Sequence, residues 1–141
     1  MSQSAELLAN ARAELNARCN TVEEAYQFML AYAGQGLASD AGSAKGSQVR
    51  EYLTKAEAAL SGLTSIVDTF SGAADDPVLA PYVAFMKVID GDAKASRAAI
   101  GLVLAQPSIS SQVIDNLNAS IHLRALLTDL FLVDEVLKGV K

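Results

Sequence analysis

The chain has 141 residues, a formal net charge of −5 and a hydrophobic fraction of 51%, much of it alanine. This length is sufficient for one domain with a substantial core, and we expect residues 1–141 to form a single helical domain. Nucleic acids and anionic membranes are bound by clustered cations, whereas Lys and Arg are scattered through this acidic chain. We therefore expect neither a nucleic-acid nor a membrane partner.

The beginning of the chain lacks the charged and then apolar pattern of a signal peptide, and no apolar run approaches the roughly 20 residues that cross a membrane. Cys19 is the single cysteine, so no disulfide can form within the chain, which fits a reducing compartment. These features predict a cytoplasmic protein.

Two short helices are expected in the first quarter of the chain. Residues 4–18 carry apolar side chains at helical spacing, and Asn20 and Thr21 interrupt this pattern. Thr21 and Glu24 then match a capping box, in which a hydroxyl and a carboxylate three residues later each bind a free N–H group. A second helix is therefore predicted over residues 22–33.

A glycine-rich segment follows at residues 34–47, with the sequence GQGLASDAGSAKGS. Its small residues predict a flexible surface loop, although its length also allows a lid or a binding loop. The segment matches neither the GxxxxGK(S/T) nor the GxGxxG pattern, and no strand is predicted before it. A phosphate-binding loop is therefore not expected.

Two longer helices come next. Residues 47–70 place apolar side chains at nearly strict heptad spacing, which predicts close packing against a neighbouring helix. The following helix extends to about residue 105. Asp76 and Pro81 both offer a beginning for it, and the start remains open between them. Whether Asp90-Gly91-Asp92 breaks this helix also remains open.

The last helical pattern is the longest, and it covers residues 109–138 without Gly or Pro. It carries two apolar stripes on different faces. One stripe is a heptad seam, which packs against a single partner helix. The other requires a second neighbour, either from the same chain or from another subunit. The seam consists of Ala119, Leu123, Leu126, Leu130, Val133, Leu137 and Val140, and the second stripe of Ile114, Leu117, Ile121, Ala125 and Leu132.

Together these patterns predict an all-α fold, an antiparallel bundle of four or five helices whose long C-terminal helix is central or lies at a subunit interface. The surplus apolar face indicates a non-enzymatic interaction or regulatory protein. We expect it to form a homodimer through its C-terminal helix, and another protein is a possible further partner. The predicted interface residues are Leu123, Leu126, Leu130, Val133 and Leu137.

A small apolar ligand is the alternative partner, and the protein would then be a carrier or a sensor. Aromatic and methionine side chains at helical spacing can line a cavity between helices, although core packing explains the same residues more simply. The candidate pocket residues are Tyr26, Met29, Tyr32 and Phe131.

His122 is the single histidine and lies on a narrow polar stripe of the predicted long helix. The stretch HLRAL that begins at His122 resembles the HxxKG signature of histidine phosphotransfer domains, which are acidic helical bundles with one exposed histidine. Here the basic residue comes two positions after the histidine instead of three, and the glycine is missing. The resemblance implies that His122 is a phosphoacceptor, whereas a solvated histidine at a helix edge is the simpler interpretation. The other polar residues of the stripe are Ser111, Asp115, Asn118 and Asp129.

Catalytic and metal-binding motifs are incomplete in this sequence. One histidine and one distant cysteine do not form a zinc site, and a di-iron bundle needs Glu where Ala119 precedes His122 by three residues. No GxSxG nucleophile motif occurs, and the paired aspartates do not fit an EF-hand loop. We therefore expect no metal, no cofactor and no enzymatic activity.

Overall fold

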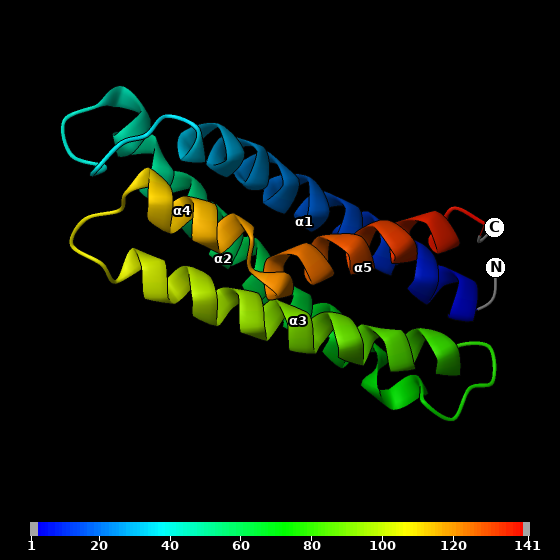
Figure 1. Ribbon diagram of the computed structural model, residues 1–141. Helices are drawn as coiled ribbons and strands as arrows, with labels where there is room; N and C mark the ends of the chain where they lie inside the picture. Colours follow the sequence, from blue (N-terminus) through cyan, green and yellow to red (C-terminus); the bar gives the residue numbers. More distant parts are fainter. Residues whose placement is uncertain (1–2, 140–141) are drawn as a thin grey trace.

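The computed structural model describes residues 3–139, which form an antiparallel bundle of α-helices (Figure 1). The predicted all-α fold is confirmed, and no strand occurs within these residues. None of the helices in this range is long and apolar enough to cross a membrane. The elements are α1 (Gln3–Ala33), α2 (Ala44–Phe70), the short 3-10 helix η1 (Ser71–Ala73), α3 (Ala80–Leu104), α4 (Ser111–Asn118) and α5 (Ile121–Leu137).

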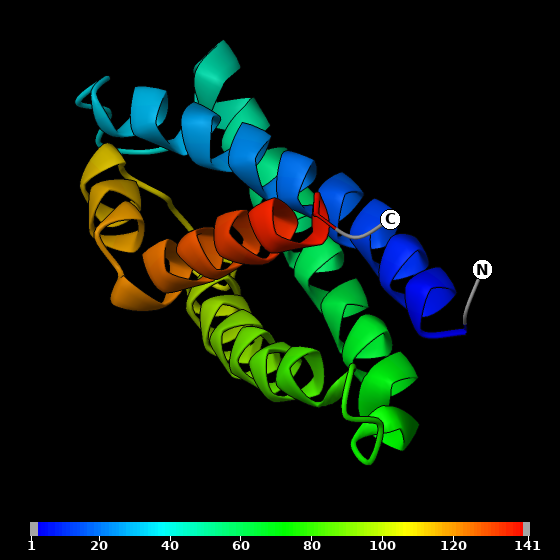
Figure 2. The same cartoon turned by 90° about the vertical axis from the view of Figure 1, so that its right-hand side faces the viewer.

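The α-helices of the described chain occupy four positions in the bundle. α1, α2 and α3 follow one another as antiparallel neighbours, and α4 and α5 together form the fourth side (Figure 1). α4 packs mainly against α1, whereas α5 lies between α1 and α3 and contacts both (Figure 2). The start of α1 and the end of α5 therefore lie at the same end of the bundle.

α1 is one continuous helix of 31 residues, so the predicted break at Asn20 and Thr21 is wrong. The Thr21 hydroxyl donates to the carbonyl oxygen of Ala17 at 3.2 Å and is thus satisfied within the helix instead of capping a new one. Cys19 and Val22 are both buried on either side of these polar residues. The apolar face of α1 therefore continues through the position at which a break was expected.

The connection between α1 and α2 is shorter than predicted, because α2 begins at Ala44 instead of residue 47. Its residues are hydrogen-bonded to the region where α4 starts. The N–H of Leu37 donates to the Ser111 hydroxyl at 2.8 Å, and the N–H of Ser111 donates to the Leu37 carbonyl oxygen at 2.8 Å. The Asp40 carboxylate accepts from the N–H of Ile109 at 2.7 Å. The predicted flexibility of this loop stays a prediction.

α3 resolves the two points that the sequence left open. It begins at Ala80 with Pro81 in its first turn, where a missing N–H leaves no bond unmade. It is also unbroken at Gly91. Ile89 and Ala93 on its inner face are buried, so packing continues on both sides of the glycine.

The predicted helix over residues 109–138 is divided into α4 and α5, so the prediction of one long helix is wrong. The chain leaves the helical conformation at Ser120, whose backbone angles are φ −57° and ψ 127°. In a straight helix the two apolar stripes would face different sides. Because of the break, Ile114 of α4 and Leu123 of α5 are both buried in one core. Burial of the α4 part of the second stripe together with the seam of α5 is therefore a physical reason for the break.

Candidate functional site

The residues predicted to form a subunit interface lie in the core of the single chain. Each of them is at most 5% exposed, because α5 turns this side toward α1 and α3. These side chains contact helices of the same chain, and the apolar residues of α5 that stay accessible are different ones. The buried set is Leu123, Leu126, Leu130, Val133 and Leu137.

α5 exposes a second group of apolar residues on the side turned away from this core. Ile121 is 74% exposed, and Phe131, Leu132 and Val136 are each about half exposed. Ile121 and Leu132 belong to the second stripe predicted from the sequence, so that surplus apolar surface is present on α5. Clusters of exposed large apolar side chains are typical of interaction surfaces. We call these four residues the α5 face.

An open groove of about 280 Å³ adjoins the α5 face, between α3 and α5. Val133 lies at its base and is 5% exposed, whereas Leu132 and Val136 form its rim on α5. The lining is almost entirely apolar. The α3 side consists of Pro81, Tyr82 and Phe85, of which Pro81 and Tyr82 were not among the residues predicted to line a cavity.

The sequence does indicate that α3 has a second apolar side at Tyr82 and Phe85. Tyr82 and Phe85 each precede a residue of the buried stripe, Val83 and Met86, by one position. A second apolar pair beside the core stripe indicates a helix with apolar contacts on two sides. The pattern does not reveal that the neighbour on that side is α5, since this depends on the break at Ser120.

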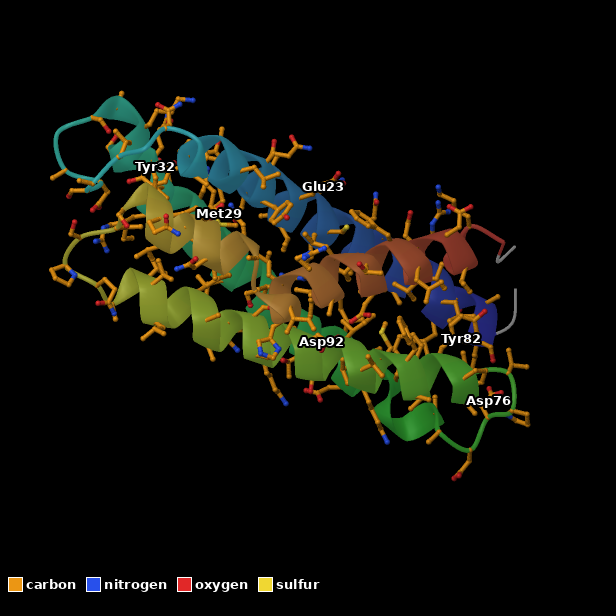
Figure 3. The ribbon with its side chains drawn as sticks, in the orientation of Figure 1. Glu23, Met29, Tyr32, Asp76, Tyr82 and Asp92 are labelled. Carbon is orange, nitrogen blue, oxygen red and sulfur yellow. The ribbon has the colours of Figure 1, made fainter. Side chains whose placement is uncertain are left out.

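The carboxyl groups of Asp92 on α3 and Asp129 on α5 face each other. Asp92 lies two helical turns after Phe85, which places the pair about 10 Å from the groove along the helices. Asp92 lies midway along α3, and Figure 3 shows it between the helices, with Tyr82 toward the beginning of α3. Burial, a hydrogen bond with Asp92 and the charge of Asp92 together raise the pKa of Asp129 on α5 to about 7. The Oδ2 atom of Asp129 is buried without a hydrogen-bond partner in the described chain. The pair therefore retains a proton until the pH approaches neutrality.

The four residues predicted to line a ligand pocket are distributed between the core and the surface. Met29 and Tyr32 have no exposed surface, and both point from α1 into the bundle (Figure 3). The Tyr32 hydroxyl donates to the carbonyl oxygen of Ile109 at 2.7 Å. Tyr26 is partly buried, and Phe131 belongs to the exposed α5 face. Core packing accounts for Met29 and Tyr32.

His122 is exposed in the first turn of α5. The polar stripe on which it was placed is not one surface, because the break changes the direction of the helix. Ser111 and Asn118 are buried, whereas Asp115 is exposed. The exposed imidazole is accessible, as a phosphoacceptor must be, and this role stays a prediction.

No group of three or more His, Cys, Asp or Glu side chains within residues 3–139 is arranged to hold a metal ion. Cys19 is buried. Desolvation, with the negative charges of Glu23 and Asp134, raises the pKa of its thiol to about 11. A thiol with such a pKa is protonated at neutral pH and is a weak nucleophile.

No family model, curated protein or solved structure matches the chain.

Proposed function

We propose that this chain is a non-enzymatic interaction protein that forms a homodimer through the α5 face and the adjoining groove. The observation that carries the proposal is the exposure of Leu132 and Val136 at the rim of an apolar groove. Covering such side chains with a second copy removes apolar surface from water, which stabilises a complex by about 25 cal/mol per Å². Both residues lie on a regular helix, so little ordering is needed before they bind.

The charges beside the α5 face favour a second copy as the partner. Arg124 and Glu135 are both exposed, and they lie eleven positions apart, close to three helical turns, on the same side of α5. Two α5 helices can pair antiparallel about a two-fold axis, with Thr128 opposite Phe131 of the second copy. In that register Arg124 lies opposite Glu135 twice. The surface is therefore complementary to itself in charge.

A pair of matched leucine substitutions tests this proposal. Leu132 is 54% exposed at the groove, and Leu102 is 67% exposed near the other end of α3. We expect the wild type to sediment as a dimer at about 10–100 μM, a range that detects micromolar affinity. Leu132→Glu should give a monomer with unchanged helical circular dichroism, and Leu102→Glu should stay dimeric. A monomeric wild type, or equal loss of the dimer in both variants, would contradict the proposal.

The groove also supports a second function, as the binding site of a small apolar ligand. Its volume of about 280 Å³ is close to the lower end of known ligand sites, and Tyr82 adds one hydroxyl to an apolar lining. Native mass spectrometry separates the two functions. A dimer mass supports self-association, whereas a monomer with an added mass that denaturation releases supports the ligand.

A further inference from the structure

We propose that α5 can leave its own bundle and pack into the bundle of a second copy, with the break between α4 and α5 as the hinge. The product is a domain-swapped dimer in which α4 and α5 form one straight helix. This inference does not depend on the proposed function, because the α5 face is at the surface in both the closed and the swapped arrangement.

The hinge departs from helical geometry at one backbone angle. Ala119 is helical, with φ −77° and ψ −10°, and the φ of −57° at Ser120 is also compatible with a helix. A rotation of ψ at Ser120 from 127° to about −42° would join α4 and α5. In the described chain the residues with positive φ are Gly36 and Gly42, and neither is near this break. Nothing in the local sequence therefore prevents a straight helix.

The bent connection leaves polar groups at the hinge without partners. Asn118 is 5% exposed, and neither Oδ1 nor Nδ2 of its side chain has a hydrogen-bond partner in the described chain. Ser120 is in the N-cap position of α5, but its hydroxyl makes no capping bond. Ser110 shows the contrast, since it caps α4 by accepting from the N–H of Val113 at 3.1 Å. The closed state thus has a buried unpaired amide and an α5 helix without a side-chain cap, and both lower its stability.

α4 and α5 are held to the rest of the chain by different contacts. The Ser111 hydroxyl in α4 donates to the carbonyl oxygen of Tyr32 at 2.7 Å, in addition to the bonds with Leu37. α5 packs through its apolar seam, forms an ion pair between Asp134 and Arg12 of α1 at 3.7 Å, and shares a hydrogen bond between Asp129 and Asp92 of α3. Apolar packing is restored in full when an identical α5 occupies the same place. α5 is therefore the part of the chain that can exchange while α4 stays anchored.

The swapped dimer would also give the heptad seam a role between subunits. The five predicted interface residues of α5 would then contact α1 and α3 of the second copy. The same residues would be a core in the monomer and an interface in the dimer.

Substitutions at position 121, made in the Leu132→Glu background, test the hinge without the surface dimer. Ile121 is the first residue of α5 and is 74% exposed, so its side chain contributes little to packing. Proline fits this first helical position, and Ser120 already has the extended conformation that precedes proline. In a straight helix the same proline would clash with the carbonyl of residue 117. Ile121→Ala is the matched control, because it removes the side chain and permits both forms.

The measurement is dimer formation after concentrated protein is warmed to just below its unfolding midpoint and then cooled. We expect a dimer that persists on dilution for Leu132→Glu, both alone and with Ile121→Ala. With Ile121→Pro the yield of this dimer should fall about 100-fold or more, because proline inside a helix disfavours the straight helix by that factor or more. Adding Ser120→Ala to Leu132→Glu should raise the yield of the dimer, because alanine favours the straight helix. Light scattering after size exclusion gives the mass, and circular dichroism checks that each monomer is folded.

Two results would overturn the swap. One is the absence of a persistent dimer from Leu132→Glu both with and without Ser120→Ala. The other is an equal yield with Ile121→Pro and Ile121→Ala. Failure of the proposed function appears separately, as a wild type that is monomeric before warming.

Discussion

Arg50 of α2 and Asp40 of the preceding loop form an ion pair, with 2.8 Å between Nε and Oδ2. The same guanidinium donates to the carbonyl oxygens of Leu104 and Gln106, at 3.0 and 2.7 Å. The second oxygen of Asp40 accepts from the N–H of Ile109. One pair of side chains therefore joins the first loop, α2 and the connection from α3 to α4, and closes the end of the bundle opposite the chain termini (Figure 1).

Asp40→Asn should lower the free energy of unfolding by about 1–3 kcal/mol at neutral pH, since it weakens charge-assisted hydrogen bonds. The hydrogen bond from Ile109, with the contribution of Arg50, holds the pKa of Asp40 below its usual value despite burial. A lowered folded-state pKa stabilises above the unfolded value of about 3.9, and this stability is lost as the pH falls through the folded pKa. Urea titrations between about pH 3 and pH 7 should show the difference shrinking below about pH 4. A difference independent of pH would argue against this role.

Gly46 and Gly91 give a matched pair of glycine substitutions. A methyl group at Gly46 would overlap the backbone of Asp40, whereas one at Gly91 meets no atom within 4 Å. Gly46→Ala should destabilise the protein by about 1–3 kcal/mol through overpacking. Gly91→Ala should stabilise it by about 0.5–1 kcal/mol, because glycine is unfavourable inside a helix. Thermal unfolding of both variants checks the opposite signs.

The helix boundaries predicted from the sequence are correct where one apolar stripe is continuous. They are wrong at two places where polar residues interrupt the stripe. Thr21 resembled a helix start, yet its hydroxyl bonds within α1 and Val22 continues the buried face. Ser120 resembled helix interior, yet burial of both Leu117 and Leu123 requires a bend there. Five helices were expected, and the described residues form five α-helices. The agreement in number hides two errors, because a break was expected within α1 and none was expected between α4 and α5. Periodicity shows which side of a segment is buried, but tertiary packing decides whether two segments share one axis.

The candidate site was predictable only in part, for the same reason. The surplus apolar stripe included Ile121 and Leu132, which are exposed, but also Ile114 and Leu117, which are buried. The heptad seam could not be assigned to core or interface, because either environment buries one side of a helix. The facing of Asp92 and Asp129 depends on the pairing of α3 with α5, which no local pattern indicates.

Leu130→Ala and Leu132→Ala should separate core from surface on α5. Leu130 is 1% exposed, so its truncation should lower the free energy of unfolding by about 2–5 kcal/mol. Leu132 is 54% exposed, and its truncation should change stability by about 0.5 kcal/mol or less when the protein is dilute and monomeric. Urea unfolding monitored by circular dichroism measures both. Similar losses in the two variants would disagree with this arrangement of α5.

Asp129→Asn should stabilise the protein above neutral pH. The folded-state pKa of about 7 lies above the unfolded value, so the contribution of Asp129 is most favourable at low pH. Stability is lost as the pH rises from about 4 to 7 and then levels off. We expect the variant to exceed the wild type by about 1–2 kcal/mol at about pH 8, a value reduced for partial solvent exposure, and to match it near pH 4. Asp115→Asn, which removes one carboxylate at an exposed site on α4, is the matched control.

Arg124→Glu should weaken the proposed surface dimer by about 3- to 30-fold, because it places like charges opposite each other at two symmetric positions. Combining Arg124→Glu with Glu135→Arg should restore the affinity, since the exchange reverses both partners. Sedimentation at two salt concentrations measures the effect, which should be smaller at high salt. A double variant as weak as the single one would show that these residues do not meet.

The reactivity of the buried Cys19 thiol can report how often the bundle opens. With a pKa of about 11 and little exposure, it should be inert toward disulfide reagents while the bundle is closed. Since the charge of Asp134 on α5 acts on this thiol, the two helices are close there, and opening of that region would release the cysteine to react. The rate at which Cys19 is labelled would then measure the frequency with which α1 and α5 separate. No probe has to be introduced into the protein for this measurement.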